Sequence, residues 1–115
     1  AARYNKPGFD LFSHHVYTLC GDGDMMEGIS SEAASTAGHL KLGNLIWMYD
    51  ANRISIEGST DIALTENVAE RFAAYGWQVL ELKDANDTAA LKDLLAQAKA
   101  ETTQPTFILV HSVIA

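Results

Sequence analysis

Two polar side chains in this sequence stand where they could hold a metal ion together. Asp22 lies between two glycines directly after an apolar segment, and Asn52 follows a second apolar segment 30 residues later. A carboxylate oxygen, an amide oxygen and a nearby backbone carbonyl are the hard oxygen ligands that Mg²⁺ or Ca²⁺ takes, and Mg²⁺ commonly adds substrate phosphates and water. The residue types therefore indicate a metal-bridged diphosphate site.

The glycines that flank Asp22 support this interpretation. Gly21 and Gly23 allow the backbone to approach a phosphate closely. A helix that begins near Asp24 would also direct its free N–H groups, and the positive end of its dipole, toward the bound anion. The segment thus combines a candidate metal ligand with candidate phosphate donors.

Simpler interpretations remain open for each of these residues. Gly-Asp-Gly is frequently an ordinary turn, Asp24 and Glu27 could form a helix-capping pair, and Asn52 could form an Asx turn. The segment is not a dinucleotide-binding fingerprint, because Met26 occupies the third glycine position, and no Gly-Lys-Ser/Thr of a P-loop is present. The occurrence of an Asp and an Asn after successive strands favours the functional interpretation.

The elements that must position these side chains alternate between strand and helix. Apolar, β-branched segments predict buried strands at 15–20 and 45–49, further strands at 77–82 and 106–110, and a short extended piece at 54–58. Helices are predicted from Asp24 to about Gly43, from a cap at Thr65 to Tyr75, and from a cap at Asp87 or Thr88 onward. We therefore expect an α/β fold, a parallel β-sheet with helices on both faces, with Asp22 and Asn52 at the carboxyl edge.

Apolar residues at helical spacing predict which side chains face the core. The inward sets of the three helices are Met26, Ile29, Ala33, Ala37 and Leu40 in the first, Val68, Phe72 and Tyr75 in the second, and Leu91, Leu94, Leu95 and Ala98 in the third. Cys20, Trp47, Trp77 and the methionines are also expected in the core rather than in a redox or stacking role.

Composition and charge exclude several classes of protein. The chain has 115 residues, a formal charge of −7 and 48% hydrophobic residues, which is typical of a globular domain. The acidic balance argues against a nucleic-acid partner, and no apolar run approaches the ~18–20 residues of a membrane span. The single Cys20 cannot form an internal disulfide, which fits a cytoplasmic location. The start lacks an initiator methionine and a signal peptide, so we expect a segment of a longer protein.

Longer stretches of the sequence resemble the transketolase family of thiamin diphosphate enzymes. Gly21-Asp22-Gly23 with Asn52 is similar to the diphosphate-binding motif of these enzymes. The stretches that resemble transketolase itself are GDGDMMEGISSEAASTAGHLKLGNLI at 21–46, ISIEG at 54–58, PGFD at 7–10 and AAYGWQVL at 73–80. The resemblance covers nearly the whole chain and implies that residues 1–115 are part of one thiamin diphosphate-binding α/β domain.

The resemblance also implies roles for individual residues. The side chains of Asp22 and Asn52 would ligate Mg²⁺ or Ca²⁺ together with the main-chain oxygen of Ile54. The backbone N–H of Gly23 would bind the diphosphate of thiamin diphosphate, and Ile56 would pack near its thiazolium ring.

The family's reaction moves a two-carbon ketol unit from a ketose phosphate to an aldose phosphate, as in the pentose phosphate pathway, and the family's enzymes are homodimers. The histidines and arginines that bind substrate in the family lie outside this chain, so we expect the isolated chain to be inactive. The chain's own histidines are interpreted as structural or surface residues; they are His14, His15, His39 and His111.

Glu27 and Glu32 are candidates for a proton shuttle. In the family, glutamates at these places face the subunit interface and link the two active sites. Small residues on the same helix would permit close approach of a second copy; they are Ala33, Ala34, Ser35, Ala37 and Gly38. The alternative makes Glu27 a helix cap and Glu32 a solvated surface residue.

Two other functions remain as alternatives. A related thiamin diphosphate enzyme such as dihydroxyacetone synthase would share the same motif. A Mg²⁺-dependent receiver-type signalling domain also gathers acidic residues at strand ends, but it needs a lysine after a late strand, where this chain has His111-Ser112.

Overall fold

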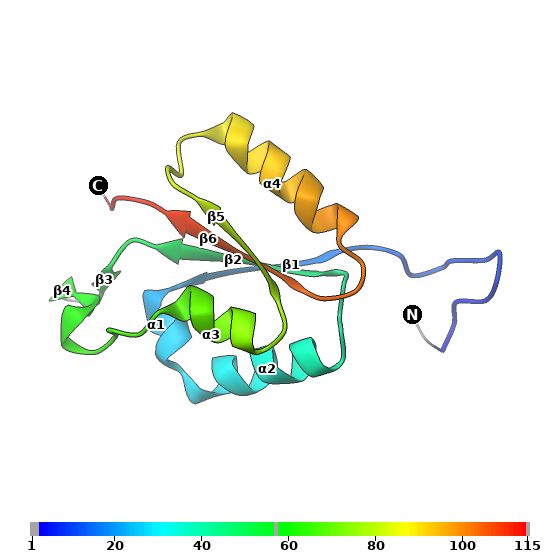
Figure 1. Cartoon of the computed structure of the whole chain (residues 1–115), viewed down its shortest axis with the longest axis horizontal. Coiled ribbons are helices and arrows are strands. Elements are labelled where there is room, and N and C mark those ends of the chain that lie inside the picture. Colours follow the sequence, from blue (N-terminus) through cyan, green and yellow to red (C-terminus); the bar gives the residue numbers. More distant parts are fainter. Residues whose placement is uncertain (1–2, 57, 115) are drawn as a thin grey trace.

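The computed structural model describes residues 3–56 and 58–114 and contains a four-stranded parallel sheet in the order β1-β2-β6-β5 (Figure 1). The strands are β1 (Val16–Gly21), β2 (Leu45–Ala51), β5 (Gln78–Leu82) and β6 (Thr106–His111), and a short antiparallel hairpin comprises β3 (Ile54–Ser55) and β4 (Gly58–Ser59). The helices are α1 (Asp22–Met26), α2 (Gly28–His39), α3 (Val68–Ala74) and α4 (Thr88–Ala100), with a 3-10 turn at Thr60–Ile62. The α/β fold with a parallel sheet is confirmed.

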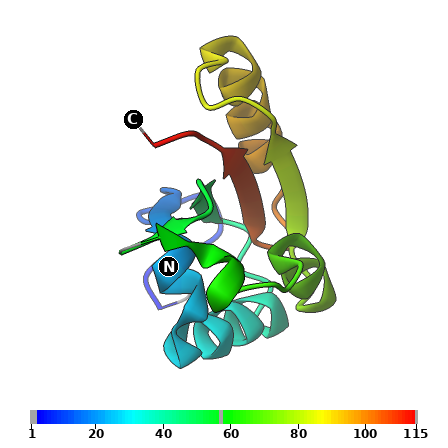
Figure 2. The same cartoon turned by 90° about the vertical axis from the view of Figure 1, so that its left-hand side faces the viewer.

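Helices cover both faces of the sheet, as expected. Figures 1 and 2 show α1, α2 and α3 on one face and α4 alone on the other. An aromatic cluster fills the first face, where the Phe72 and Phe107 rings stack with centroids 3.8 Å apart. On the α4 face, Ala98 packs against Ile46 and Ile108 of the sheet. The aromatic face thus forms the larger part of the core that supports the carboxyl edge.

The helix expected from residue 24 to residue 43 is two helices. Glu27 separates α1 from α2 in an extended conformation, with φ −71° and ψ 134°. The predicted apolar stripe is therefore wrong at four positions: Met26 and Ala33 are exposed, Ile29 is 69% exposed and Leu40 is 58% exposed. The break interrupts the helical periodicity. Counting apolar residues at helical spacing from α1 through α2 therefore predicts the wrong buried face of α2.

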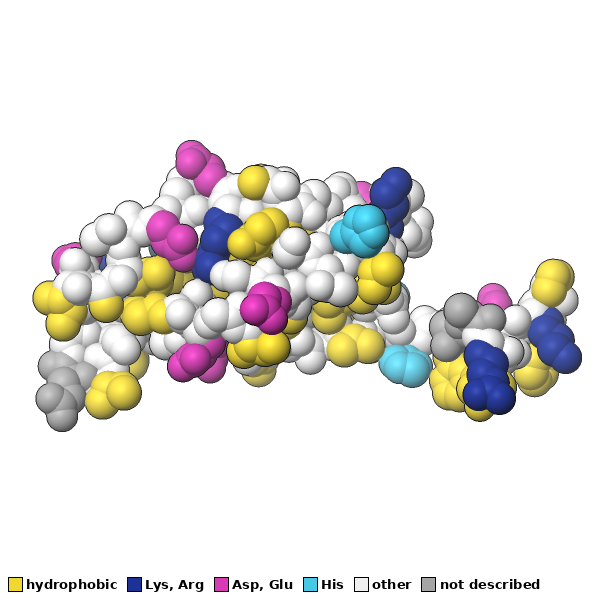
Figure 3. Space-filling view, turned by 90° about the horizontal axis from the view of Figure 1, so that it is seen from below, with side chains coloured by type: hydrophobic (Ala, Val, Ile, Leu, Met, Phe, Trp, Pro, Cys, Tyr) yellow, Lys and Arg dark blue, Asp and Glu magenta, His cyan; other side chains and the backbone are white. Residues whose placement is uncertain are grey.

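α1 buries Asp22 and Met25, and α2 buries Ala34, Ala37 and Gly38. Figure 3 views the molecule from the side of these helices, and apolar side chains lie at its surface among acidic ones.

The other helix boundaries follow from their caps. Asn67, rather than the expected Thr65, caps α3, since its Oδ1 accepts a hydrogen bond from the Glu70 backbone N–H at 3.2 Å. Asp87 caps α4 by accepting from the Ala90 N–H at 2.9 Å, which confirms one of the two predicted caps. Of the predicted inward side chains of α3 and α4, Val68, Phe72 and Ala98 are buried, and Tyr75, Leu94 and Leu95 are half-buried against the core; Leu91 is also half-buried.

β1 is an edge strand of the sheet, and the prediction of a buried strand at residues 15–20 is wrong. Within the described residues it pairs only with β2, and Leu19 is 77% exposed. The interior strand β2 pairs on both sides and buries Ile46 and Tyr49, as expected. Among the described residues, no helix combines the length and apolar character needed to cross a membrane.

Candidate functional site

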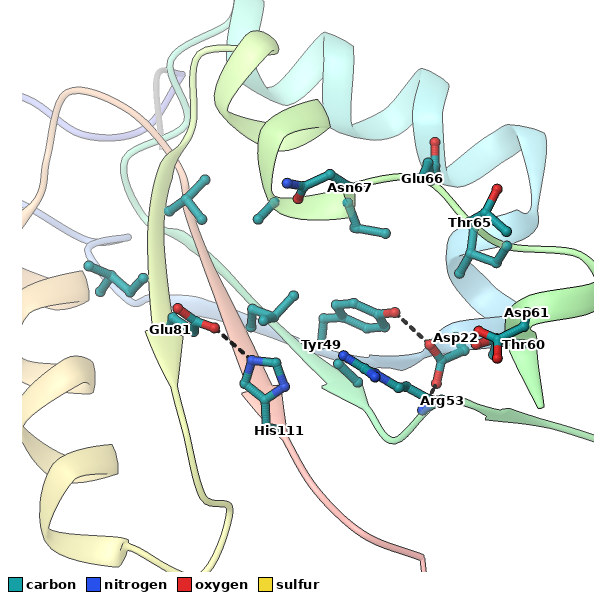
Figure 4. Close-up of a pocket in the computed structure, with 17 residues that line it drawn as sticks. Asp22, Tyr49, Arg53, Thr60, Asp61, Thr65, Glu66, Asn67, Glu81 and His111 are labelled. Atoms are coloured by element: carbon teal, nitrogen blue, oxygen red, sulfur yellow. Dashed lines mark hydrogen bonds and ion pairs between the residues drawn. The ribbon is translucent and has the colours of Figure 1, made fainter. Parts of the chain in front are cut away.

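The carboxyl ends of β1 and β2 meet at one corner of the sheet, where Asp22 is buried. Asp22 directly follows β1, and only 4% of the residue is exposed. Its Oδ1 accepts a hydrogen bond from the Tyr49 hydroxyl at 2.6 Å, and its Oδ2 accepts from the backbone N–H of Arg53 at 3.1 Å (Figure 4). One carboxylate therefore joins the end of β1, the interior strand β2 and the loop after it.

The charge of Asp22 is not compensated by the basic side chains of the described segments. Both of its hydrogen-bond donors are neutral, and none of the ion pairs found in residues 3–56 and 58–114 includes it. Burying a carboxylate without an opposite charge is costly. The corner is therefore chemically suited to a bound cation.

Tyr49 holds its proton firmly. Burial of the side chain, followed by the hydrogen bond to Asp22, raises the pKa of Tyr49 above its ordinary value. Its ring stacks on Phe107 with centroids 5.8 Å apart. The hydroxyl is therefore a fixed donor, and sequence reasoning missed it because nothing in the pattern distinguishes it from other aromatic residues of a buried strand.

Asn52 forms an Asx turn, which the sequence left open as an alternative. Its Oδ1 accepts from the Ile54 backbone N–H at 2.9 Å, and its Nδ2 donates to Asp50 Oδ2 at 3.2 Å. The turn places Arg53 at a positive φ of 61° and directs its N–H at Asp22. An amide oxygen has two lone pairs, so the turn leaves one of them free for another partner.

The other predicted binding residues lie around this corner. Gly23 is in the first turn of α1, and apart from its own helix and chain neighbours no atom of the described residues lies within 4 Å of the place where its side chain would begin. α1 contacts β3, which contains Ile54. Ile56 is 100% exposed in the turn of the β3–β4 hairpin. The structure thus brings Asp22 and the loop at 52–54 together, and the ligand roles stay predictions.

Glu27 and Glu32 are both exposed at the surface of α1 and α2. The capping alternative for Glu27 is wrong, because its side chain makes no capping hydrogen bond to α2. At the start of α1, Asp24 is the third helical residue, and its Oδ2 accepts from the N–H of the N-cap residue Gly21 at 2.8 Å. The shuttle role of the two glutamates stays a prediction.

Three of the small residues of α2 pack inside this chain. Ala34, Ala37 and Gly38 are buried, and the Trp77 Nε1 donates to the Ala34 carbonyl at 2.8 Å. A Cβ at Gly38 would lie 1.9 Å from the Tyr75 carbonyl oxygen. The expectation that these three residues face a second copy is wrong, because the α3–β5 turn already occupies that space.

A cleft of about 770 Å³ extends along the carboxyl edge from Asp22 to His111 (Figure 4). At its far end the Glu81 Oε1 lies 2.6 Å from Lys83 Nζ and 2.7 Å from His111 Nε2. The hydrogen bonds from Lys83 and from His111 lower the pKa of Glu81 below its usual range. His111, which the sequence indicated as a structural or surface residue, is half-buried, and its place in the cleft was missed.

No cluster of three or more His, Cys, Asp or Glu side chains suited to a metal ion occurs in residues 3–56 and 58–114. The ligand set predicted from the sequence is not such a cluster, because it has a single carboxylate, that of Asp22, together with an amide oxygen and a main-chain oxygen. Cys20 is a half-buried free thiol whose pKa is raised to about 12 by burial and by the charge of Asp24. Its Sγ donates to the Met48 carbonyl at 3.5 Å, in keeping with the expected packing role.

Comparisons with known proteins agree on one family. The family model described as "Transketolase, thiamine diphosphate binding domain" matches residues 1–115. The chain is 54% identical over 114 residues to a transketolase of Streptococcus pyogenes and 52% identical over 115 residues to transketolase 1 of Saccharomyces cerevisiae. These matches include 99% of this chain but only 16% and 17% of those proteins, so the chain spans about one-sixth of its relatives' length.

Solved structures show the same relationship. A Pichia stipitis transketolase, described as a complex with sedoheptulose 7-phosphate, superposes with a TM-score of 0.92 at 48% identity, covering 96% of this chain and 17% of that chain. A Leishmania mexicana transketolase gives a TM-score of 0.92 at 44% identity with the same coverage.

Proposed function

The chain belongs to the transketolase family, in its thiamin diphosphate-binding domain, and from this premise we propose that the protein containing it is a transketolase. Such a protein transfers a two-carbon ketol unit from a ketose phosphate to an aldose phosphate. The complex of the Pichia stipitis relative with sedoheptulose 7-phosphate supports sugar phosphates as substrates. We also propose a homodimer in the cytoplasm, where the free thiol of Cys20 would stay reduced.

The observation that carries the proposal is the buried carboxylate of Asp22, whose hydrogen-bond donors among the described residues are both neutral. A divalent cation would supply the missing opposite charge. We assign the side-chain oxygens of Asp22 and Asn52 and the main-chain oxygen of Ile54 as the protein ligands of Mg²⁺ or Ca²⁺. One carboxylate and two neutral oxygens leave positions for water and a diphosphate.

The remaining residues of the corner would bind and orient the cofactor. The N–H of Gly23 would donate to the diphosphate, and the open space beside Gly23 admits a close approach. The exposed apolar side chain of Ile56 would pack against the thiazolium ring. When bound, thiamin diphosphate supplies the covalent chemistry of ketol transfer. Glu27 and Glu32 would move protons between the two sites of a dimer.

The proposal is tested with the full-length protein and a ketose phosphate–aldose phosphate pair. We expect ketol transfer that requires both thiamin diphosphate and a divalent ion, and its absence under those conditions would refute the function. The isolated 115-residue chain should give no turnover at any cofactor concentration, because the groups expected to bind substrate lie outside it. Turnover above background by the isolated chain would show that catalytic groups lie within it.

A further inference from the structure

We propose that Tyr49 is a positioning residue for the metal site and that its contribution is larger for Mg²⁺ than for Ca²⁺. The inference rests on the proposed function, in which Asp22 ligates the ion. No step of the reaction involves Tyr49 directly. Its hydroxyl acts by fixing the direction in which the Asp22 carboxylate faces.

Two donors from different elements hold the Asp22 carboxylate. The Tyr49 hydroxyl bonds Oδ1 at 2.6 Å, and the Arg53 N–H bonds Oδ2 at 3.1 Å. Because each oxygen has its own donor, rotation of the carboxylate would break at least one of these bonds. The remaining lone pairs therefore point in fixed directions, as with the outer-shell partners of metal-binding carboxylates.

The core fixes the position of the Tyr49 hydroxyl in turn. Tyr49 is 4% exposed, and its ring stacks on Phe107, with centroids 5.8 Å apart and planes at 29°. Phe107 is fully buried and stacks on Phe72 of α3. A phenol clamped in this way cannot follow a carboxylate that turns, so the packing of the sheet with α3 determines the geometry at Asp22.

The two ions differ in how much they need a fixed carboxylate. Mg²⁺ requires near-ideal octahedral geometry at short distances, whereas Ca²⁺ accepts a variable number of ligands at longer and more variable distances. A carboxylate that can rotate still serves Ca²⁺ but meets the Mg²⁺ geometry only part of the time. Loss of the Tyr49 hydroxyl should therefore weaken Mg²⁺ binding more than Ca²⁺ binding.

The test is Tyr49→Phe in the full-length protein, with each ion titrated by equilibrium dialysis at saturating thiamin diphosphate. The dissociation constant for Mg²⁺ should rise about 10- to 100-fold, as is usual for loss of an outer-shell partner. The constant for Ca²⁺ should rise by less than about 3-fold, because its coordination is more flexible. Unchanged constants, or equal increases for both ions, would overturn the proposal.

Tyr75→Phe is the matched control. Tyr75 also packs its ring against Phe72, with centroids 6.1 Å apart, but its hydroxyl makes no hydrogen bond within the described residues. This variant should bind both ions as the unaltered protein does. Preferential weakening of Mg²⁺ binding here as well would overturn the role of Tyr49.

A second variant covers the case in which Tyr49→Phe does not fold. Phe107→Leu keeps the Tyr49 hydroxyl but removes the ring beneath it, so it should weaken Mg²⁺ binding more than Ca²⁺ binding, by a smaller factor. Equal effects on the two ions would overturn the proposal.

Asp22→Ala separates failure of this inference from failure of the proposed function. If Asp22→Ala binds both ions normally, the proposed function of the site is wrong. If Asp22→Ala loses both ions while Tyr49→Phe changes neither constant, only the role of Tyr49 is wrong.

Discussion

Two carboxylates at the same edge of the sheet, Asp22 and Glu81, have opposite surroundings. Asp22 is buried, and in the part of the chain that the structure describes its two hydrogen-bond donors, the Tyr49 hydroxyl and the Arg53 N–H, are neutral. Glu81 is exposed and contacts two basic side chains, those of Lys83 and His111. Basic side chains of residues 3–56 and 58–114 compensate the charge of Glu81 but form no ion pair with Asp22. An acidic residue becomes a candidate cation ligand because of its partners rather than its position at a strand end.

The difference originates in the path that the chain takes at the end of each strand. After β1 the chain turns at once into α1, and the loop after β2 folds back so that Arg53 reaches Asp22. Glu81 lies within the edge strand β5, and Lys83 follows that strand into solvent. Exposed ion pairs of this kind contribute little to stability and are screened by salt.

The largest effect should come from the uncompensated carboxylate. In the full-length protein, Asp22→Ala should raise the dissociation constants of the metal and of thiamin diphosphate together, each by more than about 100-fold, because loss of an outer-shell partner alone costs about 10- to 100-fold. Paired titrations of ion and cofactor measure this, with Glu81→Ala as the control at the compensated carboxylate. An unchanged affinity in Asp22→Ala, or an equal loss in Glu81→Ala, would remove the distinction between the two carboxylates.

Asn52→Ala should have a smaller effect in the same assay. The variant loses a neutral ligand rather than a charged one, so we expect a smaller loss of metal affinity than in Asp22→Ala, near the upper end of the about 10- to 100-fold range of an outer-shell partner. Asp50→Ala is the control. It keeps the Asn52 Oδ1 and its hydrogen bond from the Ile54 N–H, and it removes the carboxylate that accepts from the Asn52 Nδ2 and from the Ser112 hydroxyl. If Asp50→Ala weakened metal binding as much as Asn52→Ala, the effect would come from the turn and not from ligation.

Glu27→Gln and Glu32→Gln extend the comparison to carboxylates on the helices. Both side chains are exposed in this chain, so the substitutions should leave the thermal unfolding midpoint nearly unchanged. If they relay protons across a dimer, cofactor activation should slow by several-fold or dimerisation should weaken. Stopped-flow activation kinetics and sedimentation measure these quantities. Normal values in both variants would leave the glutamates without a functional role.

The smallest effect should come from Glu81→Gln. Since Lys83 and His111 lower the pKa of Glu81 from its ordinary value of 4.5, the ionised carboxylate stabilises the folded state at neutral pH, and this contribution is lost as pH falls through the lowered pKa. The unaltered protein should therefore unfold at a slightly higher temperature than the variant at pH 7, and the difference should shrink on acidification below 4.5. Melting curves at several pH values test this, and a difference that grew toward acid pH would contradict it.

The sequence by itself determined the α/β class and the placement of Asp22 and Asn52 after successive strands. These features depend on local patterns, namely apolar runs of strand length and capping residues such as Asp87, and each can be recognised within a few residues. The family resemblance also follows from contiguous stretches such as 21–46.

The tertiary structure decided the features that depend on contacts distant in the chain. The helix break at Glu27 has only a single glycine, Gly28, as a local signal, and it determined which face of α2 is buried. The exposure of β1 depends on its having a single neighbouring strand among the described residues. The bonds of Asp22 to Tyr49 and Arg53 join residues 27 and 31 positions apart. Periodicity within one element carries no information about such pairs, because the packing of whole elements brings them together.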